Sequence, residues 1–245
     1  MKKIFAFSLI IILFLITSTC DRSPTSSKPD LGSTPMENPE AELAALWLSG
    51  DLVAPVKLHD RIRDELALIR STWKDSIFEA NIQFYPIWVA SQLLMMFDDE
   101  TYKKIESGLF KDWDYLNKYY RVNNIELHGH SIVLLDFEGR LNPLQLVNQY
   151  ESLDGLEFVE PNNLMGDRPL LLIYDADSDL KYFFRNAWGD CPAGCINSTY
   201  NYFEVVDDSA IHRGSYYPSY PPNHDEAPVW YDTVLMARDN FYYQK

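Results

Sequence analysis

A regular pattern of apolar residues predicts a helix near the start of the folded part of the chain. The residues are Leu58, Ile62, Leu66, Ile69 and Trp73. Steps of three and four residues match the period of an α-helix, so these side chains share one face. The residues between them are mostly polar or charged. We therefore expect a helix with its apolar face on a core and its charged face in solvent.

A shorter helix is predicted directly before this one. Asn38-Pro39 has the form of an N-cap followed by a first-turn proline, and Gly50 after Ser49 is a typical helix stop. Together the two helices predict an N-terminal helical segment over residues 41–80.

From residue 81 to 206 the pattern changes to strand-length apolar runs alternating with helical stretches. The predicted order is strand, helix, strand, strand, helix, strand, over residues 87–97, 98–120, 125–127, 131–137, 142–155 and 156–159. This is the split βαβ order of ferredoxin-like domains. Further strands are predicted at 169–174, 180–185 and 200–206. The predicted fold class is therefore α+β, with a ferredoxin-like βαββαβ core, N-terminal helices and extra C-terminal β-strands.

The last segment, 207–245, is predicted to be an extension rich in aromatic residues and proline. Within it, residues 216–222 read YYPSYPP and are predicted to be extended surface chain, because proline does not continue a helix or a central strand. Residues 229–237 are predicted to return as a strand.

The first twenty residues predict where the protein resides. Lys2 and Lys3 precede an apolar run, Ile4–Ile16, in which Ser8 is the one polar residue. A membrane-spanning helix needs about 20 apolar residues, so this shorter run predicts a secretory signal peptide over residues 1–19. Small residues then lead to Cys20, and the stretch resembles the signal of a bacterial lipoprotein.

That resemblance implies cleavage before Cys20 and a lipid anchor on its sulfur. Residues 20–40 are rich in Ser, Thr and Pro and lack apolar periodicity, which predicts a disordered tether behind the lipidated Cys20. The alternative is an ordinary cleaved signal peptide in which Cys20 is incidental.

The two other cysteines, Cys191 and Cys195, lie in the stretch Cys-Pro-Ala-Gly-Cys. Outside the cytoplasm a close pair of cysteines favours a disulfide bond, which we predict for this pair. The alternative is thiol-redox or copper chemistry at Cys191 and Cys195. The spacing is similar to that of membrane-anchored copper chaperones of the thioredoxin fold, and thiolates suit Cu(I).

The charge of the chain narrows the choice of partners. It has 21 Lys+Arg against 36 Asp+Glu, a formal net charge of −15. Such an acidic protein repels the phosphates of nucleic acids, so no nucleic-acid partner is expected. Membrane attachment is expected through lipid on Cys20 rather than through surface charge.

Catalytic and metal-binding motifs are weak. The sequence has no P-loop, dinucleotide-binding fingerprint, nucleophile elbow or HExxH motif. His128 and His130 flank Gly129, where a turn is more typical than a shared strand face. We predict no enzymatic activity, no metal and no cofactor.

Three further clusters have structural interpretations. An acidic run, Asp98 to Glu100, precedes a predicted helix and is interpreted as its cap rather than as an acid–base pair. Three aspartates imitate the start of a calcium loop but lack its Gly and Glu, which favours a polar hairpin turn: Asp175, Asp177 and Asp179. Four aromatic residues near prolines are interpreted as loop packing, with sugar stacking as the alternative: Tyr216, Tyr217, Tyr220 and Trp230.

Two short stretches resemble known protein families. Residues 153–162, LDGLEFVEPN, resemble the end of the propeptide of subtilisin-type proteases, where a strand ending in Glu-Pro-Asn closes a ferredoxin-like fold. Residues 188–195, WGDCPAGC, resemble a group of uncharacterised secreted bacterial proteins with the same string. The first resemblance implies a ferredoxin-like fold, and the second implies no particular activity.

These observations predict a non-catalytic lipoprotein of the bacterial cell envelope, anchored through Cys20 with its domain outside the cytoplasm. We expect it to bind a protein or peptide partner through an exposed sheet edge, as propeptide-like domains do. The alternative function is thiol-redox or copper handling by Cys191 and Cys195.

Overall fold

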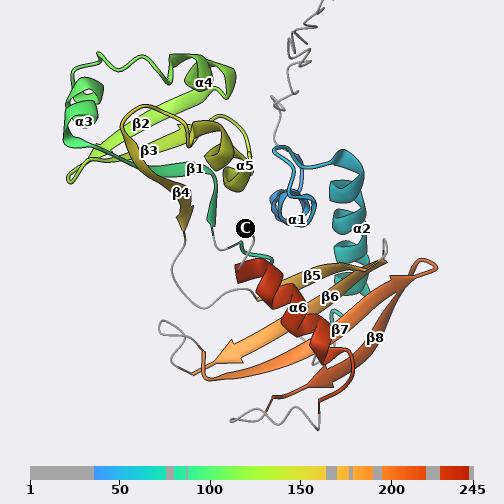
Figure 1. The fold of residues 1–245 in the computed structure, drawn as a ribbon. Coiled ribbons are helices and arrows are strands. Elements are labelled where there is room, and N and C mark those ends of the chain that lie inside the picture. Colours follow the sequence, from blue (N-terminus) through green and yellow to red (C-terminus); the bar gives the residue numbers. More distant parts are fainter. Residues whose placement is uncertain are drawn as a thin grey trace, which may run out of the picture.

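The computed structural model describes residues 36–75, 80–86, 88–163, 170–176, 179–189, 195–218 and 227–242. Within them the chain forms two antiparallel four-stranded sheets and six helices, so the predicted α+β class is confirmed. Figure 1 shows the two sheets in separate parts of the molecule, with α1 lying where the parts meet. None of the helices described is both long and apolar enough to cross a membrane.

The two N-terminal helices form where the sequence predicts them. α1 spans Pro39–Ser49 and α2 spans Val56–Thr72. The side chain of Asn38 caps α1 by accepting hydrogen bonds from two backbone N–H groups of its first turn, both at 3.1 Å. Gly50 ends α1 with a φ of 67°, a left-handed conformation that glycine adopts without strain.

The first sheet contains β1 to β4. Its part of the chain comprises β1 (Trp88–Phe97), α3 (Asp99–Glu106), α4 (Asp114–Tyr119), β2 (Val122–His128), β3 (Ile132–Phe137), α5 (Pro143–Tyr150) and β4 (Leu156–Asn163). The strand order is β2-β3-β1-β4, and every neighbouring pair is antiparallel. Alternate residues of β1 and β3 form one hydrophobic core with residues of the helices, including Leu93, Met95, Val133, Leu135, Ile105, Leu146 and Tyr150.

The single helix predicted after β1 is wrong. α3 and α4 are separate short helices, because Gly108 takes a left-handed φ of 69° just after α3. Leu109 is therefore 71% exposed, although the helical pattern puts it on the buried stripe. Phe110 is buried in its place, beside Trp113, which the same pattern puts on the buried stripe. Both rings pack edge-on against Phe97, at ring-centroid distances of 5.6 and 5.9 Å.

The second sheet contains β5 to β8 in sequence order, joined as successive antiparallel hairpins. Its strands are β5 (Leu171–Ala176), β6 (Asp179–Trp188), β7 (Asn197–Val206) and β8 (Ser209–Tyr216), and α6 (Tyr231–Tyr242) follows. On one face the Tyr182 hydroxyl donates to Glu65 Oε2 on α2 at 2.9 Å. On the other face Phe183 and Tyr202 pack on Trp230, just before α6. Both faces of the second sheet are thus covered.

Two features of the C-terminal part differ from the sequence analysis. β8 was not predicted, and it pairs with β7 although it falls in the predicted extension 207–245. The strand predicted at 229–237 is wrong, because α6 begins there at Tyr231. Tyr231, Val234 and Ala237 are all buried, and their three-residue spacing is that of one helix face.

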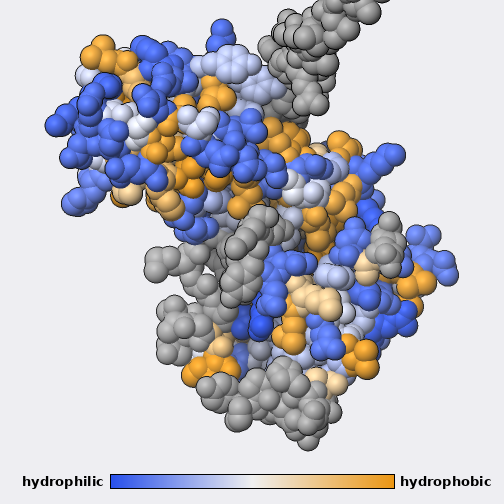
Figure 2. Space-filling view, in the orientation of Figure 1, coloured by the Kyte–Doolittle hydropathy of each residue, from blue (hydrophilic) through white to orange (hydrophobic). Residues whose placement is uncertain are grey.

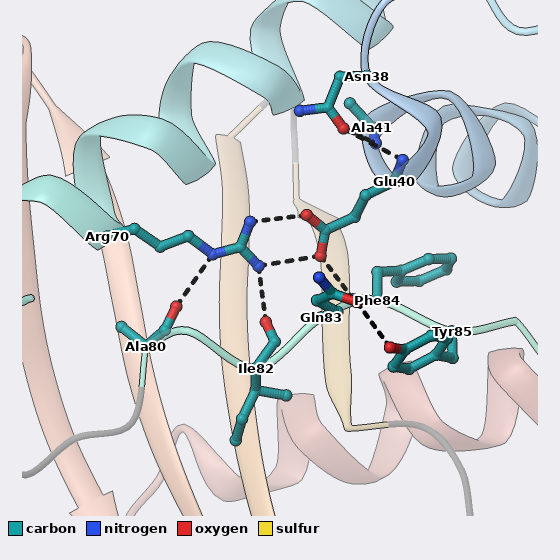
Figure 3. Close-up of polar contacts among 9 residues, drawn as sticks. All are labelled: Asn38, Glu40, Ala41, Arg70, Ala80, Ile82, Gln83, Phe84 and Tyr85. Carbon is teal, nitrogen blue, oxygen red and sulfur yellow. Dashed lines mark hydrogen bonds and ion pairs between the residues drawn. The ribbon is translucent and has the colours of Figure 1, made fainter.

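A largely buried ion pair fixes the chain where it leaves α2 for the first sheet (Figure 3). Arg70 on α2 donates two parallel hydrogen bonds to the Glu40 carboxylate on α1, at 2.6 and 2.9 Å. The same guanidinium donates to the backbone oxygens of Ala80 and Ile82, at 3.1 and 2.6 Å, and Glu40 accepts from the Phe84 N–H at 2.6 Å. The pair therefore fixes the segment that runs into β1.

α1 also contacts the first sheet. Glu42 on α1 is buried and pairs with Arg140, which follows β3. Asn142, fully buried at the start of α5, donates to the Leu46 backbone oxygen of α1 at 3.2 Å. Its own backbone N–H donates to the oxygen of Leu52 at 3.0 Å. α1 also belongs to the hydrophobic core that includes the second sheet, so it is a joint that contacts both parts of the molecule.

Candidate functional site

The face of the first sheet that points away from its helices carries three cross-strand rows of side chains. Residues on neighbouring strands that pair with each other point to the same face. The first row is Asn124, Asp136, Gln92 and Asn162; the second is Glu126, Leu134, Leu94 and Glu160; the third is His128, Ile132, Met96 and Phe158. We call these twelve positions the open face.

The first row is a continuous hydrogen-bonded network. Asp136 accepts hydrogen bonds from Gln92 Nε2 and, at 3.1 Å, from Asn124 Nδ2. Gln92 Oε1 accepts from Asn162 Nδ2 at 2.8 Å, and Asn124 Nδ2 also donates to Glu126 Oε1 at 3.0 Å. The network crosses all four strands, so it fixes the rotamers of its amides before any ligand arrives.

The other two rows have apolar centres. Leu94, Met96, Ile132 and Leu134 are only partly buried, and Phe158 is 41% exposed. None of these residues belongs to either hydrophobic core formed by the described residues. In Figure 2 the surface of this part of the molecule mixes apolar residues with hydrophilic ones. The open face is thus an apolar centre with polar groups beside it.

β2 lies at one edge of the sheet, and among the described strands only β3 pairs with it. Every residue of β2 after Val122 is exposed. Ile125 and Leu127, 41% and 43% exposed, pair with core residues of β3 and so lie on the opposite side from the open face. Such a strand offers unpaired backbone N–H and C=O groups to another chain.

An extra residue in β2, Asn123, interrupts the pairing with β3 between Val122 and Asn124. Such a β-bulge bends an edge strand and commonly lies near a functional site. A hollow of about 550 Å³ lies on the open-face side and is lined by Ser91, Gln92, Asn123, Asn124, Asp136 and Gly139, among others. A second hollow, of about 390 Å³, is lined by Asn117, Lys118, Val122, Asn123, Asn124 and Ile125. The bulge lines both.

Ser91 stiffens the floor of the larger hollow. Its φ is 64°, a left-handed conformation that costs a non-glycine residue energy. Its hydroxyl donates to the Gly139 oxygen and accepts from the Leu141 N–H at 2.7 Å, and its own N–H donates to the Leu141 oxygen at 2.9 Å. The hydroxyl is therefore used in holding β1 to the 139–141 loop, and we assign it no role as a nucleophile.

The open face is acidic. Its charged residues are Glu126, Asp136 and Glu160, and it has no Lys or Arg. His128 lies 3.5 Å from Glu126 through Nε2 and Oε2. The nearest arginine along β2 is Arg121, which sits 3.9 Å from Glu138. An arrangement of amides, carboxylates and apolar side chains suits the binding of a polar chain better than covalent chemistry.

The predicted thiol site lies partly outside the described residues. Cys20 and Cys191 belong to segments that the structure leaves undescribed. Cys195 is disulfide-bonded. A sulfur in a disulfide has no thiolate to offer Cu(I), so the state of Cys195 gives no support to the copper alternative. The pairing of Cys191 with Cys195 stays a prediction.

The other candidate residues do not come together as sites. His130 has a φ of 64° in the turn after β2, apart from the strand that carries His128. Asp175 and Asp179 flank the β5–β6 turn, and Asp177 lies outside the described residues. Within the described ranges, no three His, Cys, Asp or Glu side chains are arranged to hold a metal ion.

Asp98 acts as the sequence predicts. Its side chain accepts a hydrogen bond from the Thr101 N–H at 2.6 Å and caps α3. The hydrogen bond from the Thr101 backbone lowers the pKa of Asp98, because it stabilises the charged form. A capping carboxylate of this kind is a structural group, in line with the interpretation of the acidic run.

The aromatic residues divide into two groups. Tyr216 packs edge-on against Trp230, with ring centroids 6.4 Å apart, beside the start of α6. Tyr217 instead stacks on Trp188 at 5.8 Å. Tyr220 lies outside the described residues. The aromatics named from the sequence therefore do not form one stacking platform within the described part of the chain.

The open face was not predicted from the sequence. The run from Trp88 to Phe97 contains so few polar residues that it reads as a strand buried on both sides. One signal was available: Asn124, Glu126 and His128 alternate with Ile125 and Leu127, the period of a strand with two unlike faces. That pattern marks β2 as an amphipathic edge.

No protein-family model, curated protein or solved structure matches this chain. The two resemblances noted from the sequence therefore rest on their motifs alone.

Proposed function

We propose that this protein is a non-catalytic lipoprotein of the cell envelope that binds a protein or peptide partner in extended form along β2. The observation that carries the proposal is the exposed edge of β2, whose bulge at Asn123 lines hollows on both sides. A strand added to such an edge gains affinity from backbone hydrogen bonds and specificity from alternate side chains.

The proposal includes a ferredoxin-like core over residues 88–163. Two features support it: the strand order β2-β3-β1-β4, and the antiparallel pairing of every neighbour. Helices lie between β1 and β2 and between β3 and β4, as the split βαβ order requires. In this arrangement the helices cover one face of the sheet and leave the other for a partner.

The anchor is proposed from the sequence. The apolar run, the small residues before Cys20 and the tether up to residue 40 support a lipid on Cys20. With Cys20→Ser the protein should leave the membrane fraction and lose its lipid, because the tether offers no other apolar anchor. A variant that stays bound after a high-salt wash while unlipidated would contradict this part of the proposal.

The binding surface is tested by photo-crosslinking in the envelope of the native host. A photoreactive amino acid replaces Leu127 on β2, and a matched probe replaces Val206, which is equally exposed on the second sheet. We expect a discrete adduct from position 127 and none from position 206. Peptide mass spectrometry of the adduct then identifies the crosslinked segment. Equal labelling from both positions, or none from position 127, would contradict the proposal.

A further inference from the structure

We infer that the segment bound along β2 is cationic, with Lys or Arg alternating with apolar residues. This inference rests on the proposed function and names the chemistry of its partner. It follows from the two unlike sides of β2, together with the charge of the open face.

The side chains of a strand added to β2 continue the rows of the first sheet. Residues of the partner on the open-face side would lie beside Asn124, Glu126 and His128, at the spacing of neighbouring strands, about 4.8 Å. Glu126 is half exposed and central among them. A Lys or Arg opposite Glu126 makes a cross-strand ion pair, whereas an acidic residue there is repelled.

Residues on the other side of the added strand would meet Ile125 and Leu127. These two side chains are exposed and apolar, and Ile125 lines the smaller hollow. Lys118 lines the same hollow and disfavours a second cation there. Apolar partner residues fit this side, so the complement of β2 alternates between cationic and apolar positions.

The rest of the open face strengthens the preference for cations. Asp136 lies in the row next to Glu126, and Glu160 lies in the same row on the far strand. These carboxylates are too far from an added strand for direct contact. They contribute a negative field that salt screens over about 8 Å at physiological ionic strength. Arg121, near the start of β2, is already close to Glu138.

A second copy of this chain fits the edge poorly. Antiparallel pairing of two β2 strands would bring two Glu126 carboxylates near the centre of the contact. Each copy also has a formal net charge of −15, so the two surfaces repel each other. The same argument disfavours an acidic segment of another protein.

The test uses the full-length protein in detergent and three labelled peptides that share one length. One alternates Lys with Val, one alternates Thr with Val, and one alternates Glu with Val. Binding is followed by fluorescence anisotropy at about 20 mM and about 300 mM salt, which changes the screening length severalfold. We expect the Lys–Val peptide to bind about fivefold more tightly than Thr–Val at low salt and the Glu–Val peptide to bind least. High salt should narrow the differences.

Two variants test whether the Glu126 carboxylate causes the preference for the Lys–Val peptide. Glu126→Gln should remove most of the advantage of Lys–Val over Thr–Val. Glu157→Gln, which removes an exposed carboxylate from β4 outside the three rows, should leave that advantage in place. Both side chains are exposed, so both variants keep the fold.

The outcomes separate the two claims. Equal binding of Lys–Val and Thr–Val at both salt concentrations would overturn the inference and leave β2 as the docking edge. Binding of none of the three peptides would overturn strand addition itself. Sedimentation showing a dimer that Leu127→Asp disrupts would replace the cationic segment with a second copy.

Discussion

The two sheets have the same number of strands and opposite surroundings. The second sheet lies between α2 on one face and Trp230 with α6 on the other, so consecutive residues of β6 such as Tyr182, Phe183 and Phe184 are all fully buried. In the first sheet, burial alternates: Leu93 and Met95 lie under helices, while Leu94 lies on the open face. Sheets covered twice serve as core, and a sheet covered once keeps a surface for partners.

The difference also shows where each part tolerates change. A side chain buried on both sides has no route to relax, whereas one on the open face borders solvent. α1 contacts both parts, so we expect substitutions of its polar groups to have intermediate effects on stability. The following substitutions compare the regions in matched pairs.

The largest contrast is expected between two phenylalanines. Phe183→Ala in the second sheet removes a fully buried ring and should lower the free energy of unfolding by about 3–5 kcal/mol. Phe158→Ala on the open face removes a ring that is 41% exposed and should cost less than about 1 kcal/mol. Urea unfolding followed by circular dichroism measures both. Equal costs would mean that the open face is packed as tightly as the second sheet.

Two arginines give the next contrast. Arg70→Met leaves the largely buried Glu40 carboxylate without its partner and should cost about 2 kcal/mol, below the 3–5 kcal/mol of a fully buried pair. Arg121→Met removes an exposed pair with Glu138 and should cost at most about 0.5 kcal/mol. The same urea titration compares them. If Arg70→Met lowers the free energy of unfolding no more than Arg121→Met does, the Arg70–Glu40 ion pair in Figure 3 does not hold the chain before β1.

Two asparagine helix caps test how much the contact between α1 and the start of α5 stabilises the protein. Asn38 caps α1 only, and Asn38→Ala should cost about 1 kcal/mol. Asn142 caps α5 by accepting from the Leu144 N–H at 3.0 Å and also donates to Leu46 on α1, so Asn142→Ala should cost about 1 kcal/mol more. Thermal unfolding gives both values. If the two variants lose the same stability, the bond from Asn142 to α1 adds nothing.

The smallest effect is a dependence on pH at the edge of the second sheet. His212 on β8 contacts Trp73 and Phe203, and partial burial lowers its pKa below the ordinary value of 6.5. Below that pH the His212 side chain binds a proton in the unfolded chain, whereas in the folded chain it binds the proton only at a lower pH. Stability from this group is thus fully present above pH 6.5 and decreases as the pH falls through the lowered pKa. His212→Asn should flatten that part of the stability curve, and an unchanged curve would contradict this assignment.

Local chemistry made the fold class and the first two helices predictable. Asn38, Pro39 and Gly50 specify the ends of α1 through their own hydrogen bonds and backbone angles. The positions of β1 to β4 along the chain also followed from local patterns. These features depend on residues that are close in the sequence, so they can be predicted without the structure.

The missed features are of two kinds, one local and the others set by distant contacts. The helical period ran through Gly108, whose left-handed backbone ends α3, and so the break before α4 was not predicted. Residues 229–237 have apolar residues that suit either a strand or a helix, and packing of Tyr231 and Val234 on the second sheet decides for α6. The open face depends on which side of the first sheet its helices cover, and no local pattern in β1 reports that.

Hydrogen–deuterium exchange on the full-length protein, with and without the alternating Lys–Val peptide, tests the central claim most directly. The claim is that a partner adds to the first sheet at β2 while the second sheet stays closed. We predict that the alternate amides of residues 122–128 that point away from β3 gain protection when the peptide binds, because they become hydrogen-bonded to it, and that residues 209–216 of β8 do not change. Protection gained in β8, or binding with no change in β2, would contradict the account.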